Sequence, residues 1–296
     1  MKPVKNKEGF VAKHVPTVRS RRLTSELRRL REEAGLTWPV VAEEMGWSES
    51  KLYRIENDKS RVLPRDVKRL LDLYEISDET RRAPLIELAR RANEKGWWHQ
   101  YSETIPTWFQ PFIGLEASAA SIRVYESELV PGLLQTEGYM RAIASTAPVL
   151  AAEEEIERSV EVRLARQRRL TEEQEPLELW MVLNEAVIRR VVGGPDIMRE
   201  QLDHLAAMAQ NHRITLQILP FAKGEHSSML GAFQVLEFAG EEVPPVVYLE
   251  HQTGGLYVEK PEDIRRYTLM YNHLSVKALS EEESLAMVRQ AADGMS

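Results

Sequence analysis

The chain has 296 residues, of which 43% are hydrophobic and 29% are charged, so it is long enough for two globular domains with ordinary cores. It contains no cysteine, which excludes disulfides, thiolate zinc sites and cysteine nucleophiles and suits a cytoplasmic protein. No apolar run reaches membrane-spanning length, and the lysine-rich N-terminus has no apolar core behind it, so we expect neither a transmembrane helix nor a signal peptide.

The net charge of −7 is unevenly distributed along the chain. Residues 1–95 carry 22 Lys and Arg against 16 Asp and Glu, a charge of +6, whereas the remainder carries 17 against 30, a charge of −13. A basic domain tied to an acidic one is typical of a DNA-binding module joined to a sensing or partner-binding module.

The polar residues 1–18 are predicted to form a flexible arm. A helix follows and runs to about Ala34, because Leu23, Leu27 and Leu30 recur at helical spacing. Three arginines lie at its start: Arg19, Arg21 and Arg22. They are either a solvated helix start or phosphate contacts.

Two short helices separated by a turn at Gly46 come next. Thr37 is predicted to cap the first helix with its hydroxyl, and Ser48 to cap the second. Leu52 and Ile55 of the second helix face inward, which leaves its polar N-terminal end exposed. This is the pattern of a helix-turn-helix that reads DNA.

Four strings and one serine carry a family resemblance: Leu30-Arg-Glu-Glu-Ala-Gly-Leu-Thr37, Val41-Ala42, Met45-Gly46, Ser48 and Arg54-Ile-Glu-Asn57. With them, residues 21–76 resemble the Xre (lambda/434 repressor-like) helix-turn-helix domain. Family members usually place Gln or another neutral reader where this chain has Trp38 and Glu49. That departure leaves the target sequence open.

The resemblance implies which residues touch DNA. Base edges would be contacted by Trp38, Glu49, Ser50 and Arg54. Phosphates would be contacted by Arg19, Arg21, Arg22, Thr37, Ser48, Lys51, Asn57, Lys59 and Arg61. Arg54 can bond guanine O6 and N7, and Glu49 can accept from cytosine N4, so we predict a G·C pair under each. Arg31 and Glu56 would form a structural ion pair.

Plainer interpretations stand beside these assignments. Glu49 is favoured near a helix N-terminus by the macrodipole whether or not DNA is present. The charged loop that holds Lys59 and Arg61 is compatible with mere solvation.

Residues 77–113 are predicted to be a helical, aromatic-rich linker. Ser77 would cap a helix running to about Lys95, with a kink or restart at Pro84. Residues 97–112 are either an irregular segment packing its rings onto the second domain or the wall of a ligand pocket or partner surface. The rings that define this candidate surface are Trp97, Trp98, Trp108 and Phe109.

The remaining residues, 114–296, predict an α+β domain with a mixed or antiparallel sheet. Helices are expected over 114–126, 137–145, 151–170, 185–191, 195–211, 261–275 and 281–292. Strands are expected over 177–183, 213–219, 232–238, 246–250 and 256–259, the last after a hairpin turn at Thr253-Gly254-Gly255. The arginines at the back of helix 151–170 are interpreted as a solvated face.

This half carries a second resemblance. Its strings are Trp97-Trp98, Gly114-Leu-Glu116, Val130-Pro-Gly-Leu-Leu-Gln-Thr136, Arg163-Leu-Ala-Arg-Gln167, Gly231-Ala-Phe233 and Val247-Tyr-Leu-Glu250. They resemble an uncharacterised domain that follows the Xre-type module in many actinobacterial regulators. Some relatives are described as antitoxin-like and pair with a small acidic protein from a neighbouring gene.

Catalytic and cofactor motifs are missing from the sequence. His204 and His212 lack a third ligand nearby, so neither a metal nor a cofactor is expected. The loop 220–231 holds Lys223, Glu225 and His226, which are interpreted as a surface turn, then as an effector contact, and last as catalytic groups.

The domains expected are an arm (1–18), a helix-turn-helix domain (19–76), a linker (77–113) and a regulatory or partner-binding domain (114–296). The sequence predicts a sequence-specific transcriptional regulator, a repressor or autoregulator, that is a homodimer on double-stranded DNA. Its second domain would sense a small molecule or bind a small protein. The alternatives are an antitoxin-like protein that sequesters a small acidic partner and, less favoured, an enzyme with a DNA-binding module.

Overall fold

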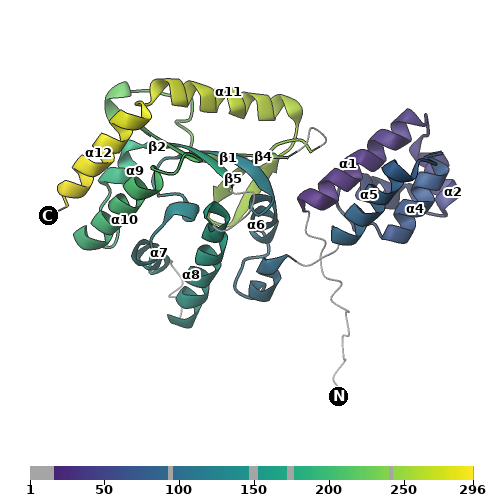
Figure 1. The fold of residues 1–296 in the computed structure, drawn as a ribbon, viewed down its shortest axis with the longest axis horizontal. Coiled ribbons are helices and arrows are strands. Elements are labelled where there is room, and N and C mark those ends of the chain that lie inside the picture. The colour runs from purple at the N-terminus through teal and green to yellow at the C-terminus, as the bar shows by residue number, and fades with distance from the viewer. Residues whose placement is uncertain (1–16, 93–95, 147–152, 172–176, 240–242, 296) are drawn as a thin grey trace, which may run out of the picture. The chain divides into compact units, whose positions relative to one another are not determined.

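The structure is a computed structural model that describes residues 17–92, 96–146, 153–171, 177–239 and 243–295. The chain divides into two compact units, residues 1–94 and 95–296 (Figure 1). The predicted N-terminal arm lies outside the described residues, except for its last two positions. Within the described part, no helix has the length and apolar character needed to cross a membrane.

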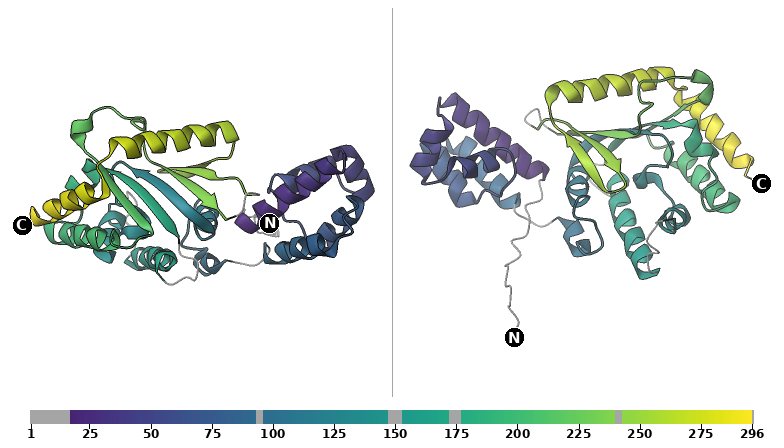
Figure 2. Two further views of the ribbon diagram at one scale, coloured as in Figure 1. Left: turned by 45° about the horizontal axis from the view of Figure 1, so that its top comes forward. Right: turned by 180° about the vertical axis from the view of Figure 1, so that it is seen from behind.

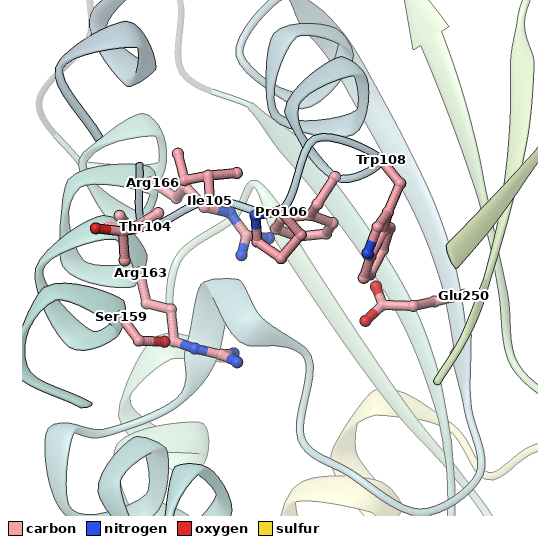
Figure 3. Close-up of a pocket in the computed structure, with 10 residues that line it drawn as sticks. Thr104, Ile105, Pro106, Trp108, Ser159, Arg163, Arg166 and Glu250 are labelled. Carbon is pink, nitrogen blue, oxygen red and sulfur yellow. The ribbon is translucent and has the colours of Figure 1, made fainter. Parts of the chain in front are cut away.

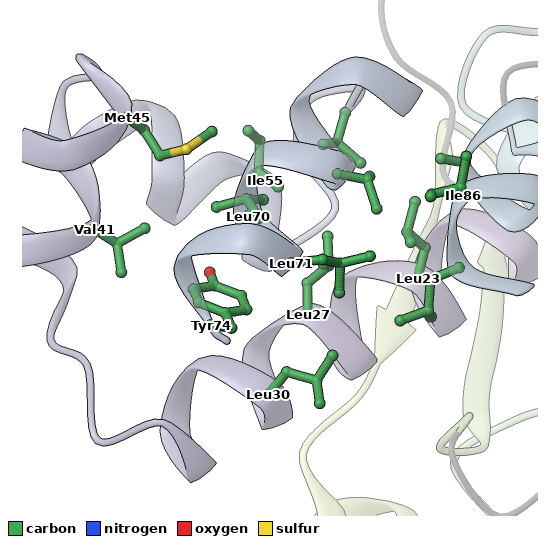
Figure 4. Packing of buried hydrophobic residues seen from close by; sticks show 14 of the residues in the cluster. Leu23, Leu27, Leu30, Val41, Met45, Ile55, Leu70, Leu71, Tyr74 and Ile86 are labelled. Atoms are coloured by element: carbon green, nitrogen blue, oxygen red, sulfur yellow. The ribbon is translucent and has the colours of Figure 1, made fainter. Parts of the chain in front are cut away.

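The first unit is all-α, as predicted. Its described residues form five α-helices: α1 Val18–Glu33, α2 Trp38–Met45, α3 Glu49–Glu56, α4 Pro64–Leu73 and α5 Glu79–Arg91. One apolar cluster joins all five, with side chains such as Leu27, Ile55 and Leu71 at most 1% exposed (Figure 4). Each such burial contributes about 1.5–3 kcal/mol, which holds α2 and α3 at a fixed angle.

Helix α5 belongs to this unit and not to a linker, which corrects the predicted boundary at residue 76. Its Leu85, Ile86 and Ala89 are buried in the same cluster as the leucines of α1. The cap of α5 is Asp78, whose carboxylate accepts from the Thr80 N–H at 2.8 Å, and not the predicted Ser77. The helix continues through Pro84 to Arg91, and its predicted end near Lys95 lies outside the described residues.

The second unit is built on a six-stranded mixed sheet in the order β3-β2-β1-β4-β5-β6. Its strands are β1 Ala119–Glu126, β2 Glu178–Asn184, β3 Ile214–Leu219, β4 Phe233–Phe238, β5 Val246–His251 and β6 Gly254–Val258. Strands β1, β2 and β3 are parallel, and β4, β5 and β6 are antiparallel to their neighbours. The α+β class with a mixed sheet is therefore confirmed.

Helices cover both faces of this sheet (Figure 1, Figure 2). The helices are α6 Gln110–Glu116, α7 Glu137–Ala144, α8 Glu153–Gln167, α9 Glu185–Arg189, α10 Pro195–Met208, α11 Pro261–Lys277 and α12 Glu281–Asp293. Helix α11 lies across one face, where Tyr271 and Leu274 pack with Tyr125 and Val247. Helices α6 to α10 lie on the other face. Ser284 of α12 accepts from the Ile218 N–H at 2.8 Å, which closes the outer edge of β3.

The central strand β1 corrects a prediction, because residues 114–126 were expected to be helical. Only the first part is, since α6 ends at Glu116 and the strand begins at Ala119. Ile122, Val124 and Tyr125 are all at most 2% exposed. A strand buried on both faces lacks the polar–apolar alternation by which a strand is recognised in sequence.

The hairpin between β5 and β6 also differs from the prediction. His251 pairs with Gly254, so the turn residues are Gln252 and Thr253, and the two glycines lie in β6. A Cβ on Gly255 would lie 2.4 Å from Cε2 of Tyr248. The glycine is therefore needed for the Tyr248 ring to cross the neighbouring strand, and not for the turn.

Candidate functional site

The turn between α2 and α3 is formed as the sequence predicts. Gly46 is the C-cap of α2 with φ 66°, a left-handed conformation that favours glycine. The Ser48 hydroxyl caps α3 by accepting from the Lys51 N–H at 3.2 Å. Thr37 occupies the N-cap position of α2, but its side chain makes no capping hydrogen bond, which corrects that prediction.

A buried ion pair anchors the end of α3 to α1. Arg31 Nε donates to Glu56 Oε1 at 2.6 Å, and its Nη2 donates to Oε2 at 3.1 Å. Burial by itself would lower the pKa of Arg31, but the hydrogen bonds and charge of Glu56 outweigh it and raise that pKa. Glu56 is 7% exposed, so it is a structural residue and does not face a ligand.

Trp38 takes part in the same arrangement. Its indole Nε1 donates to Glu56 Oε2 at 2.8 Å, and its ring meets Tyr53 edge to face with 5.4 Å between centroids. Indole has a single hydrogen-bond donor. A base contact through that donor would break the bond to Glu56, so Trp38 serves first to join α2 to α3.

The outward face of α3 carries the other predicted base readers. Glu49, Ser50 and Arg54 are all exposed, and their helix is held from behind by Leu52 and Ile55. Tyr53, 40% exposed, shares this face and was missed in the sequence analysis. The i,i+4 spacing from Glu49 to Tyr53 is the pattern that could have found it.

The predicted phosphate-contact residues fall at both ends of α3. At its start, Ser48 is exposed and the Lys51 ammonium lies 3.8 Å from the centroid of the Trp47 ring. At its end, Asn57 and Arg61 are exposed, and the Lys59 ammonium lies 5.2 Å from the Tyr53 ring centroid.

The arginines at the start of α1 lie beside that second group. The Ser20 hydroxyl donates to Asp58 Oδ2 at 2.7 Å, which ties the first turn of α1 to the loop that follows α3. Arg19 and Arg22 are exposed, and Arg21 is half-buried. The structure thus brings the arginines of α1 and the loop holding Lys59 and Arg61 to one end of the unit.

The aromatic residues 97–112 are irregular only in their middle part: a 3-10 helix covers Trp97–Tyr101, turns and bends follow, and α6 begins at Gln110. Their rings lie in two kinds of surroundings. Trp98 is buried and Trp97 is 36% exposed. Trp108 and Phe109 instead line a cavity of about 310 Å³ (Figure 3).

This cavity lies wholly within the second unit. Its other walls come from α8 and β5, with Arg163, Arg166 and Glu250 among the lining residues. A larger cavity of about 610 Å³ adjoins it and shares these three side chains and the two rings. Arg166 is buried in a bidentate ion pair with Glu116, at 2.7 and 2.8 Å, so the back of α8 is not the solvated face that the sequence suggested.

The predicted loop residues Lys223, Glu225 and His226 do not line either cavity. They lie between β3 and β4 on the side of α11, where Lys277 Nζ donates to the Glu225 carbonyl. His226 Nε2 lies 3.3 Å from the Tyr125 hydroxyl, and burial followed by the charge of Lys277 lowers the pKa of its imidazole. The residues predicted to form one effector surface therefore lie in different parts of the second unit: Trp108 and Phe109 line the cavities, and the loop residues lie beside α11.

Family comparisons agree with the two units. Residues 22–84 match the family model of a helix-turn-helix domain, and residues 109–290 match that of a domain of unknown function (DUF5753). With the exposed α3, the first match defines a DNA-binding regulator of the helix-turn-helix class. The chain belongs to the DUF5753 family, because the second match spans more than half of it. No curated protein and no solved structure matches the chain.

Proposed function

We propose that the chain is a sequence-specific transcriptional regulator of the Xre type, a repressor or autoregulator that is a cytoplasmic homodimer. The observation that carries this proposal is the pairing of an exposed α3 face with the buried Arg31–Glu56 ion pair behind it. A reading helix needs a polar outer face and a rigid mounting, because base-edge hydrogen bonds are directional.

The proposed base readers are Glu49, Ser50 and Arg54, with Tyr53 beside them. Arg54 pairs with guanine, and Glu49 accepts from cytosine, so each half-site carries a G·C pair under each residue. Phosphates are held at the start of α2, at the two ends of α3 and at the start of α1. The residues are Thr37, Ser48, Lys51, Asn57, Lys59, Arg61, Arg19, Arg21 and Arg22. Trp38 acts through its bond to Glu56.

Binding-site selection on the full chain tests this assignment. Arg54→Ala should relax selection at one position and reduce discrimination there by about 1–3 kcal/mol, whereas Glu49→Gln should relax selection at another. Arg91→Ala is the matched control, because Arg91 is an exposed arginine that pairs with Glu87 on α5. Unchanged selection in both α3 variants would refute the assignment.

For the second unit, a ligand sensor is favoured over a protein-binding module. The specific observation is the pair of adjoining cavities lined by both charged and aromatic side chains. Residues 96–296 carry a charge of −13, which opposes docking of a small acidic protein on this unit. An antitoxin-like partner would instead meet the basic first unit and compete with DNA. If such a protein still co-purifies after the first unit is deleted, the second unit binds it, which would contradict the assignment of this unit as a ligand sensor.

No catalytic role is proposed for the loop residues Lys223 and His226. His226 contacts the Tyr125 hydroxyl of β1, and the carbonyl of its neighbour Glu225 accepts from Lys277 of α11, which fits a packing role for the loop.

A further inference from the structure

The two adjoining cavities combine opposite charges with a wall of flat rings. Their shared lining includes Trp108, Phe109, Arg163 and Glu250, and the larger cavity adds Glu126. A volume of about 610 Å³ lies in the range of small-molecule sites, which run from about 300 to 1,000 Å³. The larger cavity lies at the carboxyl end of β1, where the sheet changes from parallel to antiparallel pairing. Ligands of open α/β sheets gather at the carboxyl ends of strands, where the chain order changes.

Arg163 is the group that would hold an anion. It projects from α8 toward the space that Trp108 and Glu250 border on the opposite side (Figure 3). Burial, and then the charge of Arg166, lowers the pKa of Arg163 to about 10. The neighbouring Arg166 is neutralised by Glu116, but the hydrogen bond of Arg163 goes to the neutral amide of Gln135 at 3.1 Å. Among the described residues, no carboxylate lies within ion-pair distance of Arg163. Its guanidinium lines both cavities and can donate hydrogen bonds to a carboxylate or phosphate there.

Glu126 and Glu250 are the groups that would hold a cation. Glu126 ends β1 and is half-buried, and no described residue donates a hydrogen bond to its carboxylate. Burial, and then the charge of Glu250, raises the pKa of Glu126 to about 8. Glu250 accepts one hydrogen bond, from the Tyr248 hydroxyl at 3.2 Å. Two carboxylates that share a poorly solvated cavity are stabilised when an ammonium group lies between them.

Aromatic rings line the same cavities as these charged groups. Phe109 stacks on Phe112 with 5.1 Å between centroids, and Phe112 stacks on Tyr248 at 4.3 Å. Trp108 meets Phe109 edge to face at 5.5 Å. Phe112 and Tyr248 are each 1% exposed, and the Arg166 guanidinium lies over the Phe109 and Phe112 rings. The half-buried rings of Trp108 and Phe109 line both cavities and can cover a flat apolar group.

We propose that this cavity binds a small zwitterion with an aromatic or flat apolar body, of the size of an amino acid or dipeptide. Arg163 binds its carboxylate or phosphate, Glu126 and Glu250 bind its ammonium group, and Trp108 with Phe109 covers the apolar part. The inference rests on the proposed role of the second unit as a ligand sensor and names the class of ligand. On this inference, the effector of the regulator binds in this charged cavity and not at the loop that holds His226.

Calorimetric titration of the full-length protein tests the ligand class. The probes are L-phenylalanine, L-tryptophan and glycyl-phenylalanine, with tryptamine and 3-indolepropionate as analogues that each lack one charge. At least one zwitterion should bind about tenfold more tightly than an analogue that lacks either charge, because each end makes a charge-assisted hydrogen bond. Failure of all three zwitterions to bind at millimolar concentration would overturn the inference, as would equal binding of the truncated analogues.

Substitutions locate the site. Arg163→Gln should weaken zwitterion binding about tenfold and leave the affinity for tryptamine unchanged, whereas Glu126→Gln should weaken both zwitterion and tryptamine binding. Arg189→Gln and Glu137→Gln are matched controls, because both residues are exposed in i,i+4 pairs outside the cavity. Control variants that lose as much ligand affinity as the cavity variants would also overturn the inference.

DNA binding measured on the same preparations separates the two proposals. Retained operator binding without any probe binding removes only the ligand assignment. If the unsubstituted protein does not recognise a DNA sequence specifically, the regulator assignment is wrong, whatever the calorimetry shows.

Discussion

At the scale of single residues, the carboxylate of Glu56 links three helices of the first unit. Its two oxygens accept from the Arg31 guanidinium and from the Trp38 indole, so one carboxylate fixes three helices together. The family resemblance implied the bond to Arg31. The bond to Trp38 was not foreseen, because a large aromatic residue at an exposed helix start reads as a contact for a ligand.

Glu56→Gln should therefore destabilise the first unit strongly. Removal of one partner of a buried ion pair leaves the other charge uncompensated, which costs about 3–5 kcal/mol. Denaturant unfolding measured on the full chain checks this expectation. Glu32→Gln is the control, because Glu32 contacts the same Arg31 at 3.3 Å but is exposed, and its loss should cost less than about 1 kcal/mol. Equal effects of the two substitutions would contradict this account of Glu56.

The cavity residues show a second effect at this scale. Arg163 and Arg166 are three positions apart on one helix and are the same residue type, yet only Arg166 has a buried carboxylate partner among the residues that the structure describes. The sequence gives no sign of this difference. Glu116 lies 50 positions away, and only the fold brings it to Arg166.

At the scale of elements, the helix-turn-helix depends on the left-handed turn at Gly46. No atom lies within 4 Å of a Cβ built there, so a substitution would meet backbone strain and no steric clash. The turn sets the angle between α2 and α3, and with it the direction of the exposed face of α3.

Gly46→Ala should lower the free energy of unfolding by about 1–2 kcal/mol, whereas Gly46→Asn should lower it less, because Asn tolerates the left-handed region. Thermal unfolding of the two variants measures the difference. If Ala and Asn are equally destabilising, strain in the left-handed backbone at Gly46 is not the cause of the lost stability.

Elements with a polar and an apolar face were predicted well, and those without were not. Helices α1 to α3 were located because their buried residues repeat at helical spacing, with the turn at Gly46 and the Ser48 cap marking the junction of α2 and α3. Strand β1 was missed because helices cover both of its faces, which removes the alternation. A kink or restart was expected at Pro84, but α5 continues through it as one helix, because the burial of Leu85 and Ala89 on α1 and α4 outweighs the loss of one hydrogen bond.

At the scale of the whole molecule, charge is divided between the units, +6 over residues 1–95 and −13 over the remainder. The basic unit attracts the DNA backbone, and the acidic unit repels it. This arrangement should suppress non-specific binding while it leaves base-specific contacts on α3 intact.

The fragment 1–95 should consequently bind non-specific duplex DNA more tightly than the full chain does, by roughly 3- to 10-fold at low salt. The difference should shrink at high salt, where exposed charges are screened beyond about 3–10 Å. A salt series of binding measurements on both proteins tests this. A fragment that binds more weakly than the full chain at low salt would show that the acidic unit supports DNA binding instead.

The sequence by itself determined the helix-turn-helix, its turn at Gly46 and its Ser48 cap, the outward residues of α3 and the mixed class of the second domain. These features follow from local periodicity and turn chemistry, which a short window of residues contains. Only the tertiary structure decided that α5 belongs to the first unit, that β1 is the centre of the sheet, and that Glu126, Arg163 and Glu250 line one cavity. Those relations join residues far apart in the chain, and local patterns carry no record of which distant side chains are buried together.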